Sequence, residues 1–77
     1  MTITSVDVER LAKLPLGNEI VILLKPIFDN DEFIYSALLF CETQTDRQKL
    51  INEIKSKNIT KYGDVIHTIS EIRFGRI

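Results

Sequence analysis

Residues 19–43 read EIVILLKPIFDNDEFIYSALLFCET and hold two apolar runs on either side of a short acidic turn. The first run, residues 19–28, is rich in isoleucine and valine, and no helical stripe stands out in it. Pro26 interrupts the run near its end, where a residue that cannot donate a ladder hydrogen bond is tolerated. The pattern predicts a β-strand over residues 19–28.

The second run, residues 32–43, follows an Asp-Asn-Asp sequence that is typical of a tight turn. An extended chain places residues 33, 35, 37, 39 and 41 on one face and residues 34, 38 and 40 on the other, so both faces are apolar. A helical alternative also exists, because a period of 3.6 residues is matched by Phe33, Ile34, Ala37, Leu38 and Cys41. The aromatic content and the pairing with the first run favour a strand, and the two runs are predicted to form an antiparallel hairpin.

A short helix is predicted before the hairpin. Thr4 or Ser5 can cap a helix over residues 5–14, and Pro15 together with Gly17 ends it. The apolar stripe of this segment is incomplete.

Two further segments follow the hairpin. Residues 45–57 open with Thr45 and Gln48 at the spacing of a capping box, and their apolar stripe consists of Leu50, Ile51 and Ile54. Residues 62–74 also have helical spacing with a glycine stop at position 75, although their valine, isoleucine and threonine content would suit a third strand. A helix is favoured for residues 62–74.

These elements predict a single α+β domain over residues 1–77, with an antiparallel β-hairpin packed against helices. The expected order is α-β-β-α-α, or α-β-β-α-β if the last segment is a C-terminal third strand. A two-stranded hairpin is only marginally stable by itself, so a third strand or a second copy of the chain would complete the sheet. The candidate interface residues on this hairpin are Ile34, Tyr35, Leu38 and Phe40.

The residue inventory argues against an enzyme, a metal site and a cofactor site. Cys41 is the only cysteine and His67 the only histidine, so an internal disulfide and a multi-histidine metal site are excluded. The acidic cluster at positions 29, 31 and 32 lacks the glycine and glutamate of a calcium loop, and the three isolated glycines form no phosphate-binding loop. With a single cysteine, no leader-like segment and no long apolar run, the expected compartment is the cytoplasm, without membrane contact.

The charges of the chain are distributed unevenly. Residues 1–44 carry three basic and seven acidic side chains, whereas residues 45–77 carry seven basic and four acidic ones. The basic half contains one candidate strip for nucleic acid, which consists of Arg47, Lys49, Lys55, Lys57 and Lys61. The sequence pI of about 5.7 is low for a DNA-binding domain.

The leading functional hypothesis is therefore a non-enzymatic protein-interaction or accessory regulatory module. Its expected partner is a second copy of the chain or another protein. The alternative hypothesis is a nucleic-acid-binding regulator that uses the basic strip at residues 45–61.

Overall fold

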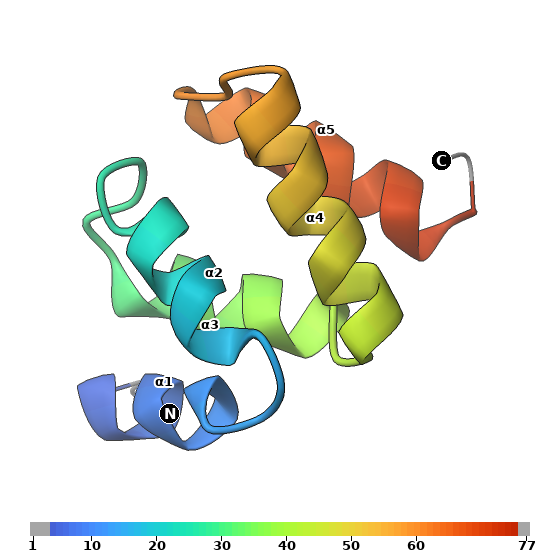
Figure 1. Cartoon of the computed structure of the whole chain (residues 1–77). Helices are drawn as coiled ribbons and strands as arrows, with labels where there is room; N and C mark the ends of the chain where they lie inside the picture. The colour runs from blue at the N-terminus through green and yellow to red at the C-terminus, as the bar shows by residue number, and fades with distance from the viewer. Residues whose placement is uncertain (1–3, 76–77) are drawn as a thin grey trace.

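The computed structural model describes residues 4–75, which form five α-helices and no strand (Figure 1). The helices are α1 (Ser5–Ala12), α2 (Gly17–Leu24), α3 (Asp31–Phe40), α4 (Gln44–Ser56) and α5 (Tyr62–Arg73). The predicted α+β class and its β-hairpin are therefore wrong, because both hairpin strands are helices.

The first predicted strand, residues 19–28, contains most of α2. Gly17, Ile20 and Leu24 are buried at helical spacing, whereas Ile22 on the opposite side of the helix is 71% exposed. Because the last five positions of α2 are all apolar, this stripe does not stand out in the sequence. Pro26 lies beyond the last turn, where its missing N–H disturbs no helical hydrogen bond.

The second predicted strand, residues 32–43, is replaced by α3. Its buried residues Ile34, Ala37 and Leu38 follow the helical alternative, and Cys41 caps its C-terminal end. The segment predicted as a hairpin turn is the start of this helix, because the side-chain oxygen of Asn30 accepts a hydrogen bond from the backbone N–H of Glu32 at 2.8 Å. An asparagine side chain that accepts a nearby backbone N–H hydrogen bond is common in tight turns and at helix N-caps, so the residue alone does not distinguish the two.

The three predicted helices are confirmed with small shifts of their ends. Thr4 caps α1, which ends two residues earlier than expected. The N-cap of α4 is Thr43 rather than Thr45, and its hydroxyl accepts from the backbone N–H of Asp46 at 3.1 Å. The last segment is the helix α5, with Lys61 as N-cap, and Gly75 follows it with a φ of 77°.

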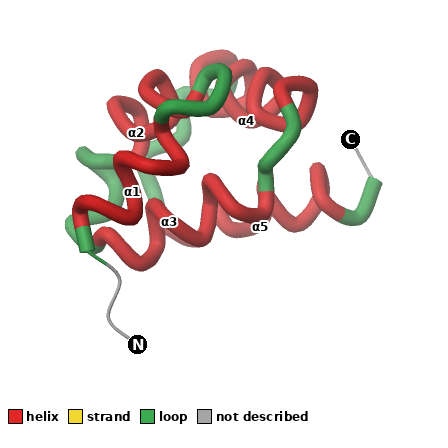
Figure 2. The backbone as a smooth tube through the Cα atoms, turned by 90° about the horizontal axis from the view of Figure 1, so that it is seen from below, coloured by secondary structure: helices red, strands yellow, loops and turns green. Residues whose placement is uncertain are grey.

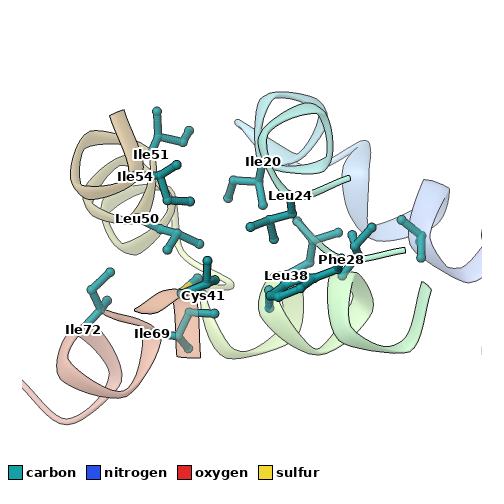
Figure 3. Close-up of a cluster of buried hydrophobic side chains, with 14 residues drawn as sticks. Ile20, Leu24, Phe28, Leu38, Cys41, Leu50, Ile51, Ile54, Ile69 and Ile72 are labelled. Atoms are coloured by element: carbon teal, nitrogen blue, oxygen red, sulfur yellow. The ribbon is translucent and has the colours of Figure 1, made fainter. Parts of the chain in front are cut away.

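The helices pack in two layers around one core (Figures 1 and 2). Helices α2 and α4 form one layer, and α3 and α5 form the other. Helix α1 packs against α2 and α3, on the side of α3 that faces away from α5 (Figure 1). The apolar side chains of the four layer helices meet between the layers (Figure 3).

A close approach between α1 and α2 explains the glycine at position 17. A Cβ atom at Gly17 would lie 2.5 Å from the carbonyl oxygen of Ala12, so any larger residue would force the two helices apart. The residue before it, Leu16, has a positive φ of 65° and turns the chain between the helices.

One arginine is completely buried among these helices. Arg47 lies in the first half of α4, and its side chain donates four hydrogen bonds to backbone carbonyl oxygens. The acceptors at the end of α3 are Cys41 O, 2.6 Å from Nε, and Leu38 O, 3.0 Å from Nη2. The other two acceptors are Leu11 O in the last turn of α1, 3.4 Å from Nη1, and Pro15 O in the connection to α2, 3.2 Å from Nη1.

We expect Arg47→Met to destabilise the fold by about 2–4 kcal/mol, because it leaves buried carbonyl oxygens at two helix ends without a donor. Urea unfolding monitored by circular dichroism measures this loss. Lys49→Met, two residues away on the same helix, is the matched control and should change the free energy of unfolding by less than about 0.5 kcal/mol. Equal stability of the Arg47 variant and the wild type would contradict the assigned role.

Candidate protein-interaction groove

The four predicted interface residues have different environments. Ile34 and Leu38 are buried in the core, and Tyr35 is half-buried against it. Phe40 is the exception, because 53% of its surface is exposed at the end of α3. Of the four, Phe40 is therefore the residue that is most accessible to a partner.

Phe40 lies on the edge of an apolar groove between α3 and α5. Helix α3 contributes residues at the spacing i, i+3, i+4 and i+7, namely Phe33, Ser36, Ala37 and Phe40. Helix α5 and its C-cap contribute residues at a similar spacing, namely Ile66, Ile69, Ser70, Arg73 and Phe74. Each helix thus turns one continuous stripe toward the groove.

The groove is lined by bulky apolar side chains, with three small residues between them. It encloses a volume of about 200 Å³, and within residues 4–75 Arg73 is the only charged residue that lines it. The walls are partly solvent-exposed, since Phe33 and Ile66 are each 39% exposed and Phe74 is 81% exposed. A contiguous set of exposed aromatic and aliphatic side chains around a hollow is typical of an interaction site.

The two helices that form the groove run in the same direction. Their first turns meet through the rings of Phe33 and Tyr62, whose centroids are 4.8 Å apart. Phe28 packs against both rings, with centroid distances of 5.7 Å to Phe33 and 5.1 Å to Tyr62. This aromatic trio links the N-terminal ends of α3 and α5, while Phe40 and Phe74 lie near their C-terminal ends.

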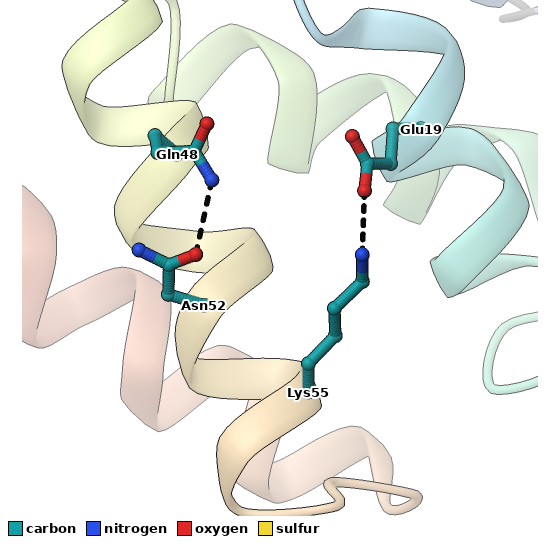
Figure 4. Close-up of polar contacts among 4 residues, drawn as sticks. All are labelled: Glu19, Gln48, Asn52 and Lys55. Atoms are coloured by element: carbon teal, nitrogen blue, oxygen red, sulfur yellow. Dashed lines mark hydrogen bonds and ion pairs between the residues drawn. The ribbon is translucent and has the colours of Figure 1, made fainter.

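The predicted basic strip is not a continuous surface. Arg47 is buried, Lys55 Nζ is 2.7 Å from Glu19 Oε1 (Figure 4), and Lys57 Nζ is 3.3 Å from Glu53 Oε2. Each of these two ion pairs offsets a lysine charge with a carboxylate. Of the four strip lysines, Lys49 and Lys61 are the two for which the described residues show no ion pair.

Helix α5 would be a poor reader of nucleic-acid bases. It carries Asp64 in its first turn, and its single histidine, His67, is paired with Glu71 one turn further on. Acidic side chains on the exposed surface of a helix repel the phosphate backbone. Helices α4 and α5 follow each other with a short connection, as in a helix-turn-helix. The side chains of α5, however, do not favour binding in a groove of the nucleic acid.

The single cysteine and the single histidine of the chain lie in different environments. Cys41 is buried in the core, and burial together with the negative charge of Asp46 raises the pKa of its thiol to about 11. His67 is exposed on α5 and pairs with Glu71. The thiol therefore stays protonated at neutral pH, which makes it a weak nucleophile.

Comparisons with known proteins add no assignment. No protein-family model matches the chain, and neither curated proteins nor solved structures give a match. Within residues 4–75, no group of three or more histidine, cysteine and carboxylate side chains could hold a metal ion. None of the helices described is both long and apolar enough to cross a lipid bilayer.

The raised pKa of Cys41 predicts a loss of stability in alkaline solution. In the unfolded chain the thiol ionises near pH 9, whereas the buried thiol holds its proton up to about pH 11. The unfolded state therefore loses the proton first, and the free energy of unfolding falls through this window by on the order of 2 kcal/mol. Urea unfolding at several pH values across this range measures the fall in the free energy of unfolding, and Cys41→Ala should reduce this fall by that amount. An unchanged slope in Cys41→Ala would contradict the assignment.

Weak nucleic-acid binding is expected because only two lysines of the basic strip lack an ion pair. A fluorescence anisotropy titration with a mixed-sequence oligonucleotide should give a slope of log K against log salt no steeper than about −2. Lys55→Glu and Lys49→Glu are informative variants, since Lys55 is already paired and Lys49 is not. A steep slope that both variants abolish would restore the strip as a binding surface.

Proposed function

We propose that the chain is a non-enzymatic protein-interaction module and that the groove between α3 and α5 is its binding surface. The observation that carries this proposal is the set of exposed bulky apolar side chains that surround a hollow along two neighbouring helices. In a 77-residue chain, an unfilled apolar surface of this size reduces solubility and stability, so its presence favours a binding role.

The shape of the groove favours a helical partner segment. An amphipathic helix inserts residues at the spacing i, i+3, i+4 and i+7 into a hydrophobic groove. The accessible lining residues Ser36 and Ser70 are small enough for a third helix to approach closely, while Phe40 and Phe74 would flank its apolar side chains. The side chains that line the groove are nearly all uncharged, so an apolar helix face would bury little charge there.

The other functions considered have less support. The five strip residues include a buried arginine and two ion-paired lysines, which weakens the nucleic-acid alternative. A catalytic role would have to use a buried, protonated thiol or a surface histidine already paired with Glu71. We expect the module to act in the cytoplasm, where a single reduced cysteine is stable.

Site-specific photo-crosslinking tests the binding surface. A photoreactive phenylalanine analogue replaces Phe40 at the groove edge, and in a second variant it replaces Ile22, which is exposed on α2 in the opposite layer. After irradiation of cells that produce the chain, we expect adducts of discrete mass from position 40 and only background from position 22. Ser70→Trp fills the groove and should remove the adducts. Equal adduct yields at the two positions, or adducts that survive Ser70→Trp, would contradict the proposal.

A further inference from the structure

We infer that the groove between α3 and α5 is also a binding site for a small aromatic carboxylate, whose ring lies among the phenylalanines and whose carboxylate pairs with Arg73. Such a ligand differs in class from the helical partner proposed above, so this site goes beyond the proposed function. The size, the lining and the charge of the groove each select one property of the ligand.

The size of the groove limits the ligand to a single ring with a short arm. The groove encloses about 200 Å³. Because a protein cavity of about 150 Å³ accepts one benzene molecule, the remaining space suits a chain of roughly two or three atoms. A phenylalkanoic acid with a short chain therefore fits the groove, with its carboxylate at the solvent-exposed edge.

The lining of the groove favours an aromatic ring. Phe33 and Phe40 on α3 and Phe74 at the C-cap of α5 all line it. Aromatic rings that meet edge to face, or stacked with an offset, contribute more than the apolar area that they bury. Phe33 already makes an edge contact with Tyr62, with ring centroids 4.8 Å apart, and this contact holds its ring in place for a ligand.

A single cation lines the groove. Arg73 lies in the last turn of α5, and no ion pair with a residue in the described range 4–75 neutralises it. No carboxylate in the same range lines the groove. A guanidinium is a planar fork of donors that can hold both oxygens of a carboxylate. The groove thus combines an apolar body with one place for a negative charge.

The charge of Arg73 acts across the groove toward the end of α3. Burial and the charge of Asp46 raise the pKa of the Cys41 thiol, whereas the charges of Arg47 and Arg73 lower it. Cys41 is the C-cap of α3, so Arg73 lies within electrostatic reach of that helix end. Arg47 already binds the carbonyl oxygens there, which offsets the partial negative charge of the helix end. A carboxylate on Arg73 therefore meets little repulsion from α3.

A titration of the isotope-labelled full chain, followed by NMR, tests the site. The probe is phenylpropionate, and phenylpropanol is the matched control without a charge. Up to about 10 mM phenylpropionate, we expect saturable shifts of the Ser36, Ser70 and Arg73 amides, with a dissociation constant on the order of 1 mM. The amide of Ile22, which is exposed on α2, should not shift.

Phenylpropanol should bind at least about threefold more weakly, which is the effect of one solvent-accessible charge pair. No saturable shift, shifts spread over all five helices, or equal affinity for the two probes overturns the inference.

Arg73→Gln tests the carboxylate contact separately. It should weaken phenylpropionate binding to the level of phenylpropanol and leave phenylpropanol binding unchanged, because the apolar lining is intact. The control Arg10→Gln removes an exposed arginine of α1 and should bind both probes like the wild type. Ser70→Trp fills the groove and should remove the binding of both probes. Circular dichroism verifies that the variants remain helical. A preference for phenylpropionate that survives Arg73→Gln overturns the inference.

The probe titrations and the photo-crosslinking separate this inference from the proposed function. If phenylpropionate does not bind but position 40 gives groove-dependent adducts, the ligand site is wrong and the interaction function stands. If phenylpropionate binds with the expected preference and position 40 gives no adduct, the ligand site stands and the interaction function is wrong. If neither is observed, both proposals are wrong.

Discussion

The buried guanidinium of Arg47 is the interaction on which the arrangement of the helices depends. The last turns of α1 and α3 have carbonyl oxygens without helical partners, and the partial negative charge of helix C-termini gathers there. Arg47 reaches from α4 to two carbonyl oxygens at the end of α3, to one in the last turn of α1 and to one in the connection between α1 and α2, and so joins three helices at one point. Burial lowers the pKa of the guanidinium from its ordinary value, yet an arginine remains charged in proteins. A lysine presents a single ammonium group rather than a planar fork, so it would not reach both helix ends in the same way.

The position of α3, and with it the groove, follows from this contact. Arg47 fixes the C-terminal end of α3, where Phe40 lies, and the aromatic trio of Phe28, Phe33 and Tyr62 fixes its N-terminal end against α5. Because both ends of α3 are held, its groove-facing stripe is a formed surface with a defined spacing. A preformed surface loses less conformational entropy on binding than a flexible one.

The sequence predicted α1, α4 and α5, in which polar residues separate the apolar ones, and it missed α2 and α3, which contain long uninterrupted apolar runs. Leu50, Ile51 and Ile54 stand out between charged neighbours, so α4 was predicted to within one residue at each end. In α2 and α3 the buried and exposed positions carry similar side chains, and periodicity cannot separate a buried helix from a buried strand. The groove could not be predicted from the sequence for the same reason, because its stripe on α3 exists only if residues 31–40 are helical. The burial of Arg47 was also unpredictable, since its acceptors come from segments up to 36 residues away in the sequence.

The fold itself explains why the groove is open. A small helical chain could cover an apolar face with its own terminal helix, and α1 is the nearest element of suitable length. Arg47, however, holds the end of α1 beside the end of α3, and α1 packs on the flank of α3 that faces away from α5 (Figure 1). Covering the groove with α1 would break these hydrogen bonds and remove Val8 and Ala12 from their buried positions. The contact that orders the five helices therefore also keeps α1 on the opposite flank of α3, away from the α3–α5 groove.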